Sequence, residues 1–153
     1  MLRVLGLHAH KGALRWAVVE GTRQNPTYVA HGRLVTPDPT QVPALMDWYE
    51  SQFIRLIEDY TPDKVAYRLT LDPDKEQLFY AEFPFGVLNL LAHHRGFPVT
   101  CLTSRSFTPS RLAKAKGIDI KAECDTVLGV HPPHWDDNQR YAVLMAWFEV
   151  GDE

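Results

Sequence analysis

Hydrophobic and polar residues along the chain change their spacing near residue 40. Before this point, short apolar runs alternate with turn residues, which is typical of strands joined by tight connections. After it, apolar residues recur at every third or fourth position from Val42 to Tyr60, the stripe of an amphipathic helix, with Thr40 as the expected N-cap. The pattern therefore predicts a three-strand meander followed by a long helix.

The remaining sequence alternates between strands and helices. The predicted strands cover residues 4–8, 14–20, 27–35, 64–71 and 97–102. The predicted helices cover residues 42–60, 78–94, 109–116, 121–128 and 136–150, and Pro84 and Gly86 give the second an irregular start. This order predicts an α/β fold with a mixed five-stranded sheet, its first three strands antiparallel and its two faces covered by helices.

Composition narrows the class of protein. With 153 residues, 45% of them hydrophobic, the chain should form one domain over residues 1–153. The net charge of -3 gives no overall attraction for nucleic acid, so any such binding needs a local basic face. Cys101 and Cys124 match no zinc signature, and no signal peptide or membrane-length apolar stretch is present. We expect a cytoplasmic protein that does not bind membranes.

Two histidines stand at the end of the first predicted strand. His8 and His10 alternate along it, so both side chains should point to one face of the sheet. Imidazole favours zinc, nickel or copper, and Asp137 is one candidate for a third ligand, as are Asp136, His131 and His134. The alternative is that both histidines line a groove that binds no metal.

One local excess of positive charge follows the last predicted strand. It consists of Arg105, Arg111, Lys114 and Lys116, with Lys121 close behind. These side chains could contact a phosphate backbone, or they could form a solvated face. If they bind duplex DNA, a four-residue patch predicts a log-log salt slope of about -3 to -4, since each contact contributes about 0.9. Exposed charges contribute little to stability, so replacing all four should leave the thermal midpoint nearly unchanged.

Four stretches resemble the RuvC-type Holliday-junction resolvases of the ribonuclease-H-like superfamily. They are VLGLHAHKGALRWAVVEG, PDKVAYRL, HHRGFPVTCLTSRSFTPSRLAKAKG and WDDNQRYAVLMAWF. The resemblance covers the element order and nearly the whole chain. It implies a ribonuclease-H-like fold, and its dimeric members make a homodimer the expected assembly.

The catalytic positions depart from that family. Such resolvases hold two divalent cations with four carboxylates, because magnesium prefers oxygen ligands. Carried over by the resemblance, these positions are His8, Arg68, Asn138 and Tyr141. A shifted alignment uses Asp136 or Asp137 and Gln139 for the last two. Arg68 places a cation where the family has an anion, so the resemblance implies the fold without the reaction.

Two functions from different classes remain. The first is a catalytically degenerate RuvC-like domain that needs no cofactor and binds a partner, either branched or duplex nucleic acid through the basic segment or another protein. The second is an endonuclease that uses a divalent metal ion held by a rebuilt ligand set: His8, His10, Asp72, Asp136 and Asp137. Close approach of Asp72 and Asp137 to His8 would favour the enzyme, whereas a salt bridge from Arg68 to Asp136 or Asp137 would favour degeneracy. A structural protein without a ligand is a third, weaker alternative.

Overall fold

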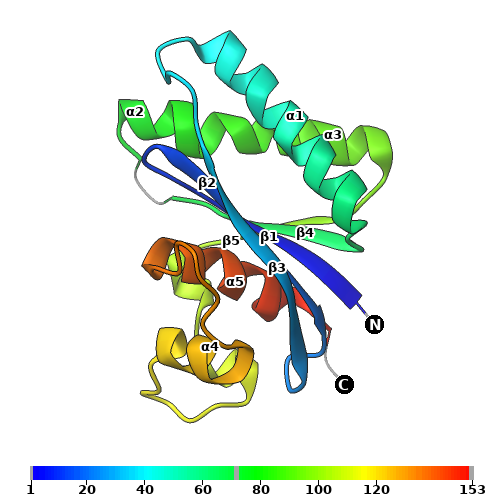
Figure 1. Cartoon of the computed structure of the whole chain (residues 1–153), viewed down its shortest axis with the longest axis vertical. Coiled ribbons are helices and arrows are strands. Elements are labelled where there is room, and N and C mark those ends of the chain that lie inside the picture. The colour runs from blue at the N-terminus through cyan, green and yellow to red at the C-terminus, as the bar shows by residue number, and fades with distance from the viewer. Residues whose placement is uncertain (1, 71–72, 152–153) are drawn as a thin grey trace.

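The computed structural model of the chain describes residues 2–70 and 73–151. Its centre is a five-stranded sheet in the order β3-β2-β1-β4-β5 (Figure 1). The strands are β1 (Leu2–His10), β2 (Ala13–Gly21), β3 (Pro26–Val35), β4 (Lys64–Arg68) and β5 (Val99–Leu102). The β1–β2 and β2–β3 pairs are antiparallel, whereas β1–β4 and β4–β5 are parallel. The predicted mixed sheet with its initial meander is confirmed.

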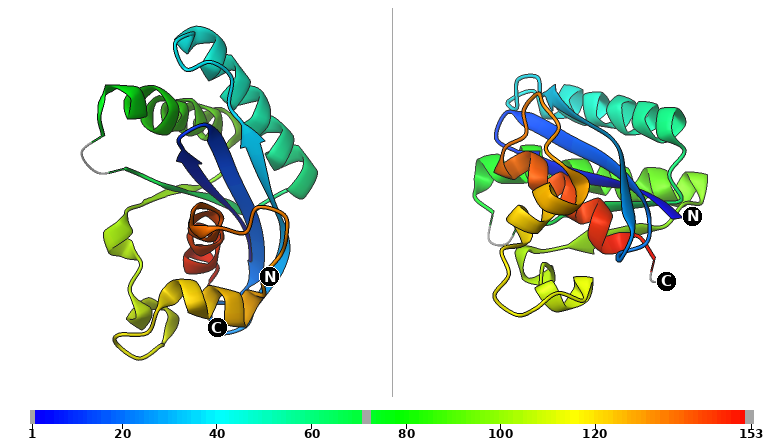
Figure 2. Two further views of the ribbon diagram at one scale, coloured as in Figure 1. Left: turned by 60° about the vertical axis from the view of Figure 1, so that its left-hand side comes forward. Right: turned by 60° about the horizontal axis from the view of Figure 1, so that its bottom comes forward.

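Helices cover both faces of this sheet. They are α1 (Val42–Tyr60), α2 (Lys75–Gln77), the π-helical turn η1 (Leu78–Glu82), α3 (Phe83–Arg95), the 3₁₀ turns η2 (Ser104–Ser106) and η3 (Pro109–Leu112), α4 (Ile120–Leu128) and α5 (Asp137–Glu149). Helices α1 and α3 lie over one face, while α5 lies against the other with α4 beside it (Figures 1 and 2). The described helices are all too short or too polar to cross a membrane.

Side chains of β1 alternate between the two faces of the sheet, so the strand contributes to a hydrophobic core on each face. Leu5 and Leu7 point into the cluster formed with α1 and α3, and Val4 points into the cluster formed with α5. Helix α5 is buried over most of its length, which fits its position between the sheet and α4. His8 lies on the α5 face of the strand, because it follows Val4 at an even spacing.

Several element boundaries differ from the predictions. Gln41, not Thr40, is the N-cap of α1, because the Thr40 backbone N–H and hydroxyl both donate to Oδ1 of Asp38. The predicted helix 109–116 is reduced to η3, since Ala113 adopts a positive φ of 56° and ends the turn. β4 ends at Arg68 although the prediction continued to Leu71, which lies outside the described residues.

Candidate functional site

One edge of the sheet gathers side chains from three elements. Strands β1 and β4 run parallel, so His8 near the end of one and Arg68 at the end of the other lie at the same edge. The first turns of α5 bring Asn138 and Tyr141 to this edge. The four positions that the resemblance singled out are therefore neighbours: His8, Arg68, Asn138 and Tyr141.

Gly6 sets the distance between β1 and α5. A Cβ at this position would collide with the carbonyl oxygen of Ala142 and lie 2.7 Å from the backbone nitrogen of Ala146. Glycine therefore lets the helix approach the strand more closely than any other residue would allow. Because Ala142 is one helical turn after Asn138, this close contact positions Asn138 beside His8.

His8 is a buried neutral imidazole. His8 is only 2% exposed, and its Nε2 donates to Oδ1 of Asn138 over 3.1 Å. Burial first, and then the positive charge of Arg68, lower the pKa of His8 to about 3. Its Nδ1 has no hydrogen-bond partner within the described ranges. His8 consequently carries no charge at neutral pH.

Arg68 and Lys121 both contact the ring of Tyr141. The Cζ atom of Arg68 lies 4.3 Å from the ring centroid, and Nζ of Lys121 lies 4.8 Å from it. Residues 2–70 and 73–151 provide no hydrogen-bond partner for the buried Nε of Arg68. Hydrogen bonds with Tyr141 and Asp137 raise the pKa of Lys121, although partial burial opposes this effect. The site is thus basic, and among the described residues no carboxylate stands at the four positions that the resemblance implied.

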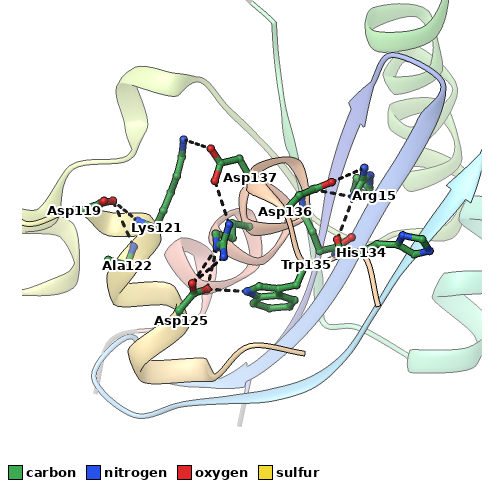
Figure 3. Close-up of polar contacts among 11 residues, drawn as sticks. Arg15, Asp119, Lys121, Ala122, Asp125, His134, Trp135, Asp136 and Asp137 are labelled. Carbon is green, nitrogen blue, oxygen red and sulfur yellow. Dashed lines mark hydrogen bonds and ion pairs between the residues drawn. The ribbon is translucent and has the colours of Figure 1, made fainter. Parts of the chain in front are cut away.

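The acidic start of α5 is bound by other cations. Arg15, the cross-strand neighbour of His8, forms two hydrogen bonds of 2.9 and 3.0 Å to the Asp136 carboxylate, and its side chain is 8% exposed (Figure 3). Asp136 also accepts from the Gln139 backbone N–H, which caps the helix. Burial raises the pKa of Asp136, but these hydrogen bonds outweigh it and hold the pKa below its usual value. The salt bridge from Arg68 to Asp136 that a degenerate site would favour is therefore not formed, because Arg15 binds this carboxylate.

Asp137 is engaged away from the histidines. Its carboxylate lies 3.3 Å from Nζ of Lys121 and 3.2 Å from a nitrogen of Arg140 (Figure 3). The His10 ring stacks on that of His8 with 5.9 Å between centroids. The described part of the chain contains no group of three His, Cys, Asp or Glu side chains that could hold a metal ion. Asp72 lies outside the described residues, and the other proposed ligands do not form a metal site among themselves.

The predicted basic segment divides into two kinds of residue. Arg111 pairs with Glu149 at 3.0 Å, and Lys114 pairs with Glu123 at 3.5 Å. Glu149 is 7% exposed and also pairs with Lys64 at 2.7 Å, which makes Arg111 part of a partly buried ion cluster around Glu149. Arg105 and Lys116 are exposed. The sequence prediction treated all four alike because the acidic partners lie on other elements.

A pocket of about 430 Å³ opens beside the site. Tyr141 and Lys121 line one side of it, with Ser104 and Phe107 from the segment after β5. Asp119 also lines this pocket, but its carboxylate accepts from the backbone N–H groups of Lys121 and Ala122 (Figure 3). A larger cavity of about 500 Å³ lies between the start of α1 and η1 and contains none of the predicted site residues.

The fold is similar to that of solved Holliday-junction resolvases. RuvC from Thermus thermophilus, solved in complex with Holliday junction substrate, superposes with a TM-score of 0.76 and 14% identity over 97% of this chain and 92% of that protein. The yeast mitochondrial Holliday junction resolvase Ydc2 gives a TM-score of 0.62 and 14% identity over 96% of this chain and 77% of the resolvase. No protein-family model and no curated protein matches the sequence. At these identities, the similarity establishes a ribonuclease-H-like fold and not an activity.

Proposed function

We propose that this chain is a catalytically degenerate RuvC-like domain that binds nucleic acid and does not cleave it. The observation that carries the proposal is the set of side chains at the edge of the sheet: His8, Arg68, Asn138 and Tyr141. This set offers hydrogen-bond donors and a positive charge in the place where the related fold would need anionic oxygen ligands.

The electrostatics of the site oppose metal-dependent hydrolysis. Two closely spaced divalent ions require carboxylates to offset their mutual repulsion. Here Arg68 adds a further positive charge, and His8 is neutral because its pKa is lowered to about 3. Asp136 and Asp137 are bound by Arg15, Lys121 and Arg140. Metal binding would have to displace these cations and would still lack an anionic ligand on β1.

The same features favour the phosphate backbone as a ligand. The fold is similar to that of a resolvase solved with its junction substrate. Arg105 and Lys116 are exposed on the segment that follows β5, on the side of the sheet covered by α5. Since the net charge is -3, attraction for nucleic acid has to come from such local cations.

Binding and cleavage of labelled DNA test the proposal together. Duplex and four-way junction DNA are titrated at low salt by fluorescence anisotropy, and the same substrates are incubated with Mg²⁺ or Mn²⁺. We expect saturable binding and no cleavage above that of the His8→Ala variant. Cleavage that is abolished by His8→Ala or Asp137→Ala would instead establish a metal-dependent endonuclease. Absence of binding by the intact protein at low salt would refute a nucleic-acid role and favour a protein partner.

A further inference from the structure

Arg68 differs from the other arginines near the start of α5. Arg15 is paired with Asp136, and Arg140 with Asp125. The guanidinium of Arg68 contacts the Tyr141 ring, and its Nε is buried with no partner in the described ranges. Leaving a buried donor of a charged group without an acceptor is costly. Arg68 therefore contacts an aromatic ring and has no anionic partner among residues 2–70 and 73–151.

The groups around Arg68 are also suited to an anion. The hydrogen bond from His8 uses the amide oxygen of Asn138, so the two N–H donors of that amide lie outside this bond. The Tyr141 ring, which contacts Arg68, is also contacted by Lys121 and therefore lies in a positive potential. His8 is 2% exposed and neutral, and because its Nε2 donates to Asn138 its Nδ1 is an acceptor that takes no part in binding an anion. The donors at this site are therefore the Arg68 guanidinium and the Asn138 amide, and both suit an anionic ligand.

We infer that Arg68, held against Tyr141, binds one phosphate group of the nucleic acid, with the amide of Asn138 as a second donor. This inference rests on the proposed function, because nucleic acid supplies the phosphate. The planar guanidinium presents paired N–H donors that match two phosphate oxygens. The pocket of about 430 Å³ beside Tyr141, with Phe107 on its wall, provides room for the neighbouring sugar or base.

Salt-dependent binding of duplex DNA tests the role of Arg68. We compare the intact protein with Arg68→Gln, Arg68→Lys and the control Arg55→Gln, an exposed arginine on α1 over the opposite face of the sheet. Arg68→Gln should weaken binding about 10-fold or more and reduce the magnitude of the log-log salt slope by about 0.9. Arg68→Lys should keep the slope and lose part of the affinity, because it retains the charge but not the paired donors. Arg55→Gln should change neither value.

Inorganic phosphate provides a readout that does not depend on DNA. Titrated into the intact protein, it should shift the NMR signals of Tyr141 and the His8 imidazole, and these shifts should be absent in Arg68→Gln. Oligonucleotides with and without a 5′-phosphate identify the kind of phosphate that is bound. If the site takes a terminal phosphate, only the 5′-phosphorylated oligonucleotide should bind. If it takes an internal phosphodiester, both should bind equally.

The outcomes separate this inference from the proposed function. If DNA binds but Arg68→Gln has the same affinity and slope as Arg55→Gln, the inference is wrong while the proposed function stands. If DNA does not bind but inorganic phosphate produces the Arg68-dependent shifts, the anion site stands and its phosphate does not come from nucleic acid. If neither probe binds, both proposals are wrong.

Discussion

At the scale of single residues, the positive charges near His8 determine its protonation state. His8 is buried, and the two arginines that act on its pKa are cationic: Arg68 and Arg15. Protonating His8 would add a buried charge beside two arginines, which explains why its pKa is so low. A carboxylate in this place would have been stabilised by the same arginines.

The low pKa of His8 predicts that acid destabilises the protein. Unfolding returns His8 to its ordinary pKa of 6.5, so between about pH 6.5 and 3 the unfolded chain binds a proton that the folded chain does not. Stability is therefore lost as the pH falls through this range. Between pH 7 and pH 5 this residue alone should lower the free energy of unfolding by about 2 kcal/mol. Urea unfolding at both pH values measures the change.

The control for this prediction is His8→Gln, which retains an amide donor and does not titrate. It should lose less stability between pH 7 and pH 5 than the intact protein does, by about the same 2 kcal/mol. An equal loss in both proteins would mean that other groups, such as His10, account for the effect of acid.

At the scale of elements, the close packing of α5 on β1 positions the site. The helix is anchored at its start by Asp136, which caps it and binds Arg15 on β2. Further along, it approaches β1 at Gly6. These two contacts fix both the rotation and the depth of the helix, so Asn138 and Tyr141 meet the side chains that extend from the ends of β1 and β4.

Gly6→Ala should disturb this packing. The added methyl group would collide with backbone atoms of Ala142 and Ala146, which cannot move without shifting α5. We expect a loss of about 2–4 kcal/mol in the free energy of unfolding, measured by urea denaturation. Gly86→Ala in α3 is the matched control, since no described atom beyond its chain neighbours and its own helix backbone lies within 4 Å of the added Cβ, and it should be neutral or stabilise by up to about 1 kcal/mol. Similar effects of both substitutions would argue against the close contact at Gly6.

At the scale of the whole molecule, most basic side chains near α5 are paired with acids. Lys64 and Arg111 hold Glu149, and Lys114 holds Glu123. Burial raises the pKa of Glu149, yet the pairs with Lys64 and Arg111 keep it below its usual value. The uniform basic patch that the sequence suggested is therefore partly a set of stabilising ion pairs.

This division predicts two different effects of removing charge. The Arg105→Ala, Lys116→Ala double variant should reduce the magnitude of the salt slope by about 1.8 and leave the thermal midpoint unchanged. Arg111→Ala should destabilise the protein by about 1–3 kcal/mol, because Glu149 is buried and loses one partner, and should change the slope little. Anisotropy titrations and thermal unfolding measure both quantities. If Arg111→Ala instead leaves the stability unchanged and reduces the salt slope, Arg111 contacts DNA and is not mainly a partner of Glu149.

The sequence by itself determined the order of most strands and helices along the chain, the antiparallel meander and the shared face of His8 and His10 on β1. These features depend on local spacing, because a strand repeats every two residues and a helix every 3.6. The resemblance also identified the four positions that meet at the edge of the sheet. The short η3 was missed, since the positive φ of Ala113 is not visible in the pattern of apolar residues.

Only the tertiary structure decided which charges are paired. Arg15 binds Asp136 across 121 positions of sequence, and Arg111 binds Glu149 across 38. No local pattern specifies such partners, because an ion pair depends on the three-dimensional distance between two long side chains and on the burial of both. The same is true of Arg68, whose guanidinium contacts the ring of Tyr141 and not a carboxylate of α5. The packing of α5 against β1 and β4 determined that contact, since it placed an aromatic ring beside the end of β4 and directed the nearby acids to other cations.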